Sequence, residues 1–279
     1  MKIGIRLHDV AGATLEEKLQ NAKAQGFCCV HLALSKVLPD FPMEKAPELL
    51  TPELAAELKA LFAKYELKVV VLGCYLNLAT PDPEELRRTM EIYKAHLRFA
   101  PLLGAEVVGT ETGNPNTAYA LDENSHTEES LRLFMDRLAP LVRYAEECGA
   151  VLAIEPVCRH IVYTPQWAAR VLEAFPTPHL RLILDMVNLM NMDNYRQAGQ
   201  LLKDAIDLMG PRIHMLHIKD YLPREGEADV ASLAAGQGCM DYTGLLNFAR
   251  SRDLSMTLED TVPENAESAR LYLENWPRA

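Results

Sequence analysis

Four residues of metal-ligating type stand at the ends of apolar segments in the second half of the chain: Glu155 in VLAIEP, Asp185 in RLILDMVN, His217 in IHMLHIKD and Glu259 in SMTLED. They lie about 30 to 40 residues apart, about the length of one strand and one helix. Three carboxylates and one imidazole suit Mn²⁺, Mg²⁺, Co²⁺ or Zn²⁺, and without an ion the carboxylates would repel one another. We expect one divalent metal ion here. The alternative is that each is an ordinary strand-end residue, solvated or paired with a basic side chain.

The apolar segments that carry these residues belong to a regular series. Most are rich in Val, Ile and Leu without strict polar alternation, which is typical of parallel strands covered on both faces. We predict eight strands, at residues 2–7, 28–33, 68–73, 106–109, 151–155, 180–185, 212–218 and 255–259.

Amphipathic segments with helix-start signals separate the strands. Thr14 with Glu17 forms a capping-box spacing, Pro follows Thr at Thr51 and Thr164, Pro83 opens a long segment, and Ser125 or Thr127 begins the run to Gly149. Shorter helical segments are predicted at about 194–209, 241–251 and 265–275. The fold class is therefore α/β, a single (β/α)₈ TIM barrel over residues 1–279. An open doubly wound sheet is the alternative, although no glycine fingerprint follows a strand.

Composition restricts the class of partner. The 279 residues are 49% hydrophobic and 24% charged, with a net charge of −11. No basic stripe is present, so we expect no nucleic-acid partner. No apolar run of membrane length or signal-peptide pattern occurs, so we expect no membrane association and a cytoplasmic protein. The six cysteines show no CxxC spacing and are expected to be buried free thiols.

Further polar residues follow the predicted strands at the end where TIM barrels carry their sites. His8, His31, Asn77, Glu111 and His160 follow strands one to five, and each is either a substrate contact or a loop-structuring residue. Lys219 shares the strand parity of His217, so it either neutralises a substrate anion or pairs with Asp220. His214 has the opposite parity and is predicted to face the helix layer as a core histidine. The glycines of AAGQGCMDY (234–242) are expected to shape a turn before the seventh helix.

The order Glu-Pro, Asp-x-x-Asn, His-x-Lys-Asp and Leu-Glu-Asp along strands five to eight resembles the xylose-isomerase-like sugar isomerase/epimerase superfamily over essentially the whole chain. The resemblance implies a metal-dependent isomerase or epimerase that moves a proton next to a carbonyl through a cis-enediolate held on the metal. It assigns the metal to Glu155, Asp185, His217 and Glu259, with Glu155 and Glu259 as the acid/base pair. Asn188 stands where those enzymes commonly carry a substrate-contacting His, which puts the familiar ketose specificity in doubt. The implied substrate is a small sugar or polyol-derived ketone, and a homo-oligomer is possible.

Three other activities compete with this interpretation. A metal-dependent lyase of the same superfamily, such as an inosose-type dehydratase, would use the same ligands and release water. A nuclease that cuts abasic DNA shares the barrel but needs more His ligands and a basic groove. A non-catalytic carbohydrate-binding barrel would not need both Glu155 and Glu259.

Overall fold

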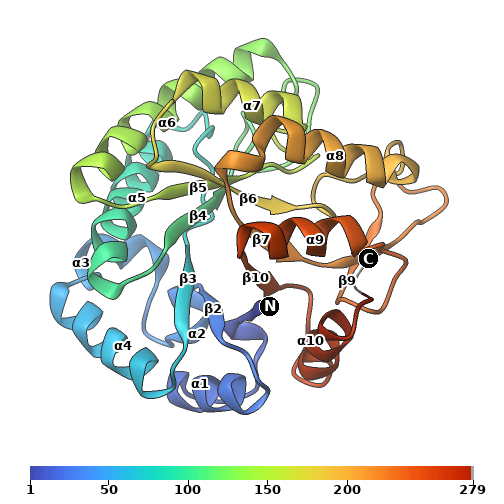
Figure 1. Cartoon of the computed structure of the whole chain (residues 1–279). Coiled ribbons are helices and arrows are strands. Elements are labelled where there is room, and N and C mark those ends of the chain that lie inside the picture. Colours follow the sequence, from blue (N-terminus) through green and yellow to red (C-terminus); the bar gives the residue numbers. More distant parts are fainter. Residues whose placement is uncertain (278–279) are drawn as a thin grey trace.

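Eight parallel strands close into a barrel in the computed structural model, which describes residues 1–277 (Figure 1). Neighbouring strands follow the order β1-β10-β7-β6-β5-β4-β3-β2 and close the ring by pairing β1 with β2. The barrel strands are β1 (Lys2–Arg6), β2 (Cys29–Leu32), β3 (Lys68–Gly73), β4 (Val107–Glu111), β5 (Leu152–Glu155), β6 (Leu180–Asp185), β7 (Ile213–Ile218) and β10 (Ser255–Leu258). The predicted TIM barrel is confirmed, and the open doubly wound sheet is wrong.

Helices follow the strands and surround the barrel (Figure 1). Thr14, Thr51, Thr127 and Thr164 each accept a backbone N–H with the side chain and so begin a helix, as their spacing predicted; Thr127, not Ser125, begins the sixth. The helices are α1 (Leu15–Ala24), α2 (Leu34–Val37), α3 (Ala46–Leu49), α4 (Pro52–Lys64), α5 (Pro83–Leu103), α6 (Glu128–Cys148), α7 (Pro165–Ala174), α8 (Ala198–Met209), α9 (Thr243–Arg252) and α10 (Ala266–Glu274). Short 3₁₀ turns occur at Leu7–Asp9, Met43–Lys45, Tyr195–Gln197 and Gly210–Arg212.

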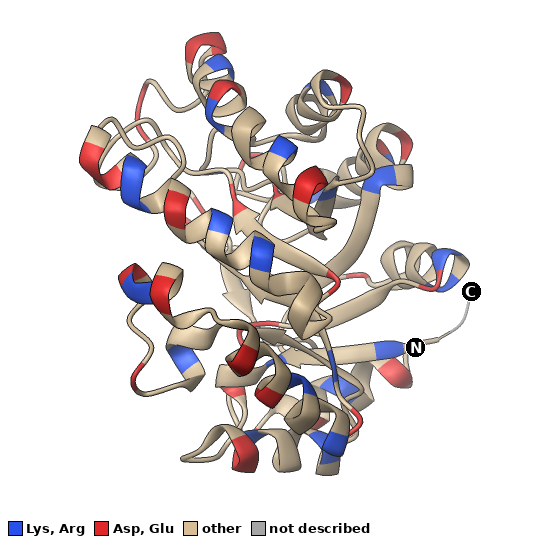
Figure 2. Ribbon diagram, turned by 90° about the vertical axis from the view of Figure 1, so that its left-hand side faces the viewer, with Lys and Arg blue, Asp and Glu red and all other residues tan. Residues whose placement is uncertain are grey.

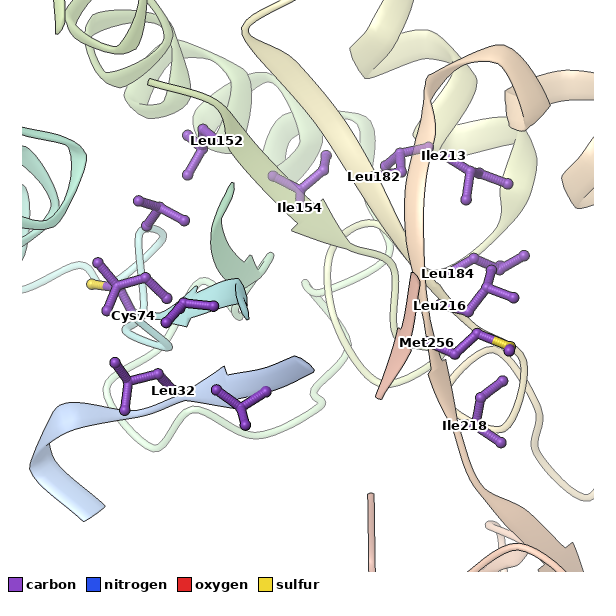
Figure 3. Packing of buried hydrophobic residues seen from close by; sticks show 14 of the residues in the cluster. Leu32, Cys74, Leu152, Ile154, Leu182, Leu184, Ile213, Leu216, Ile218 and Met256 are labelled. Carbon is purple, nitrogen blue, oxygen red and sulfur yellow. The ribbon is translucent and has the colours of Figure 1, made fainter. Parts of the chain in front are cut away.

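The hydrophobic core has two layers because each strand is covered on both faces. Outward-facing residues pack under the helices, and Figure 3 shows Leu152, Ile154, Leu182 and Leu216 in this layer. A second cluster of buried residues fills the barrel interior: Cys29, Val70, Val71, Val107, Ala153, Ile183 and Met215. Acidic and basic residues lie mainly on the surrounding helices (Figure 2). The packed interior holds the strand ends rigidly, which a multi-strand site requires.

The connection after β7 contains an antiparallel hairpin that the sequence analysis did not predict. It consists of β8 (Asp220–Leu222) and β9 (Ala231–Leu233). The following glycines serve close packing: a Cβ on Gly238 would lie 2.3 Å from the Tyr221 carbonyl oxygen, and Gly236 has φ +87°. The expected shaping role of this loop is therefore confirmed.

His214 does not face the helix layer. The pairing of β6 with β7 slips between Leu182 and Ile183, so that Leu182 pairs with Ile213 and Ile183 with Met215. His214 is the extra residue, and its Nε2 lies 3.1 Å from Oε2 of Glu106, beside β4 at the N-terminal end of the barrel. The parity argument was wrong because a bulge resets the alternation of side chains.

The cysteines are only partly as expected. None is in a disulfide within residues 1–277, and Cys29 and Cys74 are buried. Cys148 and Cys158 are half-buried, whereas Cys28 and Cys239 are exposed, so the expectation of uniform burial was wrong. In the described part of the chain, no helix combines the length and apolar character needed to cross a membrane.

Candidate active site at the C-terminal mouth of the barrel

The four residues of metal-ligating type meet at the C-terminal mouth. Glu155 and Asp185 are the last residues of β5 and β6, His217 precedes the end of β7, and Glu259 directly follows β10. Parallel register places them level, because Asp185 pairs with His217 and the N–H of Glu259 donates to the Ile218 carbonyl. All four are buried, with relative exposures between 0 and 6%. Because they are buried, these four residues are not ordinary solvated residues at strand ends.

His217 is the centre of the cluster. Its Nδ1 lies 3.0 Å from Oε2 of Glu155 and 3.2 Å from Oε1 of Glu259. Two overlapping groups bring possible ligand atoms within 4.8 Å of one another: Glu155, Asp185 and His217, and His31, His217 and Glu259. The predicted four residues are thus joined by His31, which the sequence analysis placed at the mouth but not in the ligand set.

Lys219 lies among the carboxylates. Its Nζ is 3.2 Å from Oδ2 of Asp185 and 3.2 Å from Oε2 of Glu259, and it donates to Oδ1 of Asn188 at 2.9 Å. The expected pairing with Asp220 is wrong. The Asp220 carboxylate instead accepts backbone N–H groups of the loop that follows the hairpin. The sequence analysis did not predict this contact because the loop lies 16 to 20 residues further along the chain.

The electrostatics favour cations. Burial lowers the pKa of His217, but Glu259 and Glu155 outweigh it and raise the pKa to about 9. Burial likewise opposes ionisation of Glu259, yet His217 and Lys219 hold its pKa well below the usual range. For Asp185, burial and the neighbouring carboxylates outweigh Lys219 and raise the pKa to about 6. The carboxylates thus stabilise positive charge on His217 and Lys219.

The donor set fits a divalent ion. Oδ2 of Asp185 and both ring nitrogens of His217 are buried and make no hydrogen bond within residues 1–277. Buried polar atoms normally have partners, so such orphans need an explanation. One imidazole nitrogen and several carboxylate oxygens are ligands that Mn²⁺, Mg²⁺, Co²⁺ and Zn²⁺ accept, and a bound ion would give a partner to Oδ2 of Asp185 and to one ring nitrogen of His217. The residues therefore fit the expected metal.

Asn188 connects the cluster. Its Nδ2 donates to Oε1 of Glu155 at 2.6 Å, its Oδ1 accepts from Lys219, and its backbone N–H donates to Oδ1 of Asp185 at 3.1 Å. Both ends of the amide are engaged with neighbouring side chains. In this arrangement Asn188 orients the ligands, while direct substrate contact stays a prediction.

A second polar group borders the cluster. Glu111 pairs with Glu155 in the β4–β5 register and accepts a hydrogen bond from the Tyr119 hydroxyl at 3.1 Å. Burial and repulsion by Glu155 raise the pKa of Glu111 to about 7. His160 Nδ1 lies 3.8 Å from Oε2 of Glu111, and burial lowers the pKa of His160 to about 4. Glu111 is a quarter exposed, so it faces the opening.

Two other residues predicted at the mouth, Asn77 and His8, differ in how far their polar atoms are already hydrogen-bonded. Asn77 accepts backbone N–H groups with Oδ1 and donates to the carbonyls of Asn114 and Asn116 with Nδ2, each carbonyl at 2.9 Å. It ties the loops after β3 and β4 together, the loop-structuring alternative. His8 is partly exposed, with burial and Arg6 lowering its pKa to about 4.

Several site residues were missed or left in the background. His31 stacks on His217 at 5.3 Å between centroids, and its Nδ1 lies 3.6 Å from Oε1 of Glu259. The Tyr75 ring lies 5.5 Å from that of His31, with its hydroxyl buried and unpartnered by any described residue. Arg6, at the end of β1, lies 3.6 Å from Oε2 of Glu259. A polar residue ending an apolar strand was the only signal for Arg6 and Tyr75.

Comparisons with known proteins agree with this architecture. The sequence is 26% identical to a D-psicose 3-epimerase of Enterocloster bolteae over 176 residues, which cover 60% of this chain and 56% of that relative. The fold matches the probable 3-DHS dehydratase of Bacillus anthracis, with a TM-score of 0.76, 13% identity and coverage of 99% and 100% of the two chains. It also matches the IOLI protein with a bound zinc atom, with a TM-score of 0.72, 19% identity and coverage of 98% and 95%.

The family assignment rests on a longer sequence match than the one to the D-psicose 3-epimerase. The profile of the xylose isomerase-like TIM barrel family matches residues 19–276, which include every strand except β1. The chain therefore belongs to the xylose isomerase-like TIM barrel family, which includes sugar epimerases and isomerases.

Proposed function

We propose that this chain is a divalent-metal-dependent isomerase or epimerase of a small sugar or polyol-derived ketone. The observation that carries the proposal is the convergence of three buried carboxylates on His217, with ligand atoms that lack hydrogen-bond partners in the described part of the chain. The partial match to a D-psicose 3-epimerase supports the reaction class. The zinc in a protein of the same fold supports the metal.

Glu155, Asp185, His217 and Glu259 would hold the ion. A bound divalent ion would polarise the substrate carbonyl and stabilise the oxygen that becomes an enolate. Asn188 keeps Glu155 and Lys219 in place through its two side-chain hydrogen bonds.

Glu259 is suited to be the base. His217 and Lys219 keep its pKa low, so it is ionised at neutral pH and accepts the proton from the carbon beside the carbonyl. The electron pair of the broken C–H bond moves into an enediolate. Glu155 lies beside the same ring nitrogen of His217, and we assign it the role of acid partner, which would return a proton to the opposite face to give the epimer. Return to the neighbouring carbon gives the isomer.

Polar residues at the opening would bind the substrate hydroxyls. Glu111, His160 and His8 border the cluster and are partly accessible or lack full hydrogen bonding among described residues. Lys219 would contact a substrate oxygen. Asn77 is the weakest of the predicted contacts, because its hydrogen-bonding atoms already tie two loops together.

A dehydratase is the second candidate, and Glu111 is the observation in its favour. A pKa of about 7 leaves much of Glu111 protonated at neutral pH, so it can donate a proton to a departing hydroxyl. Loss of that hydroxyl as water from the enediolate breaks the C–O bond instead of forming a new C–H bond. The product would then be lighter than the substrate by one water.

The test combines metal analysis with proton exchange. Purified protein loaded with Mn²⁺ should hold about one ion per chain, and a Glu155→Ala/Asp185→Ala variant should hold none. A matched Glu106→Ala/Asp253→Ala variant, altered at the opposite end of the barrel, should keep the ion. Ketoses and inososes are then incubated in D₂O: deuterium uptake without mass loss indicates an isomerase or epimerase, and loss of water a lyase. Absence of metal from the loaded parent would overturn the proposal.

A further inference from the structure

The Lys219 ammonium contacts carboxylate oxygens of two of the four proposed metal ligands, Asp185 and Glu259. Its ammonium lies 3.2 Å from both Oδ2 of Asp185 and Oε2 of Glu259, and its residue is only 9% exposed. The Asp185 oxygen is among the buried atoms without a hydrogen bond in the described chain. An ammonium and a divalent cation that both contact these oxygens repel each other strongly, because two like charges then lie close together in a buried pocket.

We infer that Lys219 is a built-in competitor of the divalent metal: its ammonium holds two ligand oxygens, and an entering ion must displace it. This inference rests on the metal site of the proposed function and adds a step to how that site is filled.

Hydrogen bonds hold the backbone around Lys219 in place, so a displacement of the ammonium would have to come from the side chain. The Lys219 carbonyl accepts a hydrogen bond from the Tyr242 hydroxyl at 2.8 Å. The next residue, Asp220, accepts the backbone N–H groups of Gly236 at 2.9 Å and Met240 at 2.8 Å. The four-carbon stem is the flexible part of this residue.

Asn188 provides a partner that is not one of the four ligands. The Lys219 ammonium donates to its Oδ1 at 2.9 Å, a contact that does not depend on Asp185 or Glu259. A displaced ammonium can keep this contact at the mouth of the barrel. Filling the site would thus turn Lys219 from a counter-ion of the carboxylates into a cation that faces substrate.

A purely structural role for Lys219 makes the opposite prediction. If the ammonium only held the carboxylates in ligating positions, its removal would loosen them and weaken metal binding. If it competes, removal leaves three carboxylates with one fewer counter-charge, and metal binding tightens. The direction of the change in affinity therefore separates the two roles without any measurement of activity.

The experiment compares Mn²⁺ binding by the metal-stripped parent, Lys219→Met and Lys219→Arg. Competition predicts that Lys219→Met binds Mn²⁺ at least about tenfold more tightly, since a like charge has been removed from the pocket. Lys219→Arg keeps the charge and should show no tightening. Lys203→Met removes a charge of the same kind from an exposed pair with Asp207 and should bind as the parent does.

Thermal unfolding gives an independent readout. Stripped Lys219→Met should melt below the stripped parent, and added Mn²⁺ should raise its melting temperature by more than it raises the parent's. Lys219→Gln serves the same purpose if the Met variant fails to fold. Equal or weaker Mn²⁺ binding by the neutral variants would overturn the competition and leave the metal site intact. Failure of the parent and both neutral variants to bind Mn²⁺ would overturn the proposed function as well.

Discussion

The charged side chains are exposed to solvent at the N-terminal end of the barrel and buried at the C-terminal end. At the N-terminal end, Lys2 pairs with Asp253 at 2.6 Å, and their side chains are 46% and 82% exposed. His214 pairs with Glu106 at 3.1 Å beside a cavity of about 350 Å³ with a charged lining. At the C-terminal end, the carboxylates around His217 are almost completely buried, and several of their neighbours' atoms lack hydrogen bonds within residues 1–277.

The two groups of charges differ in what they contribute to the stability of the fold. An exposed pair keeps its water and contributes little to stability. Buried charges lose their water, and their mutual attraction offsets that loss only with good geometry. A fold keeps such a cluster at a cost in stability, and a function explains why it is kept.

A comparison of two buried histidines shows that neighbouring carboxylates, and not burial, raise the pKa of His217. His96 in α5 is fully buried and bonds only to the Ile92 carbonyl among described residues, and burial lowers its pKa to about 4. His217 is equally buried, yet the carboxylates raise its pKa to about 9. Neighbouring charge therefore reverses the sign of the shift.

The largest effect is expected when a carboxylate at the C-terminal end of the barrel is compared with one at the N-terminal end. Glu259→Gln should reduce exchange of the substrate's carbon-bound hydrogen at least about 10³-fold, because the amide cannot accept the proton. Glu106→Gln, at the opposite end, should exchange at the parent's rate. Exchange is followed in D₂O by NMR, and metal content is measured in the same samples. Undiminished exchange by Glu259→Gln would remove Glu259 from the base role.

The histidines of β7 provide the next test. His217→Ala should weaken Mn²⁺ binding more than about a hundredfold, since it removes the nitrogen at the centre of the cluster. His214→Ala alters the same strand at the other end and should leave affinity unchanged. Titration with Mn²⁺ measures both. Equal affinities would mean that the ligand set lies elsewhere.

The smallest effect concerns stability and comes from His96. Its pKa is lower in the folded than in the unfolded protein, so the unfolded state binds the proton first as pH falls below about 6.5. The free energy of unfolding should lose about 2 kcal/mol from this residue between pH 8 and pH 5. His96→Gln should lack that part of the loss, as measured by urea unfolding at the two pH values. A pH dependence that is unchanged in His96→Gln would show that folding does not lower the pKa of His96.

Local patterns predicted most of the barrel. The strands at 68–73 and 180–185 begin and end where their apolar runs do, and threonine caps begin the helices, because both signals depend on near neighbours in sequence. The hairpin β8–β9 escaped prediction because its strands are three residues long. Its first residue, Asp220, accepts a backbone N–H from Gly236 in the loop that follows the hairpin, and a short window of sequence does not contain both residues.

The sequence by itself determined the fold class and the residue types at the strand ends, since chain-order repetition of strand and helix leaves few topologies. Only the tertiary structure decided how those ends meet. It placed Lys219 between Asp185 and Glu259, added His31 beside His217, and used a bulge to turn His214 away from the helix layer. The physical reason is that side-chain contacts across a barrel depend on register and loop packing, and one extra residue in a strand is enough to change them.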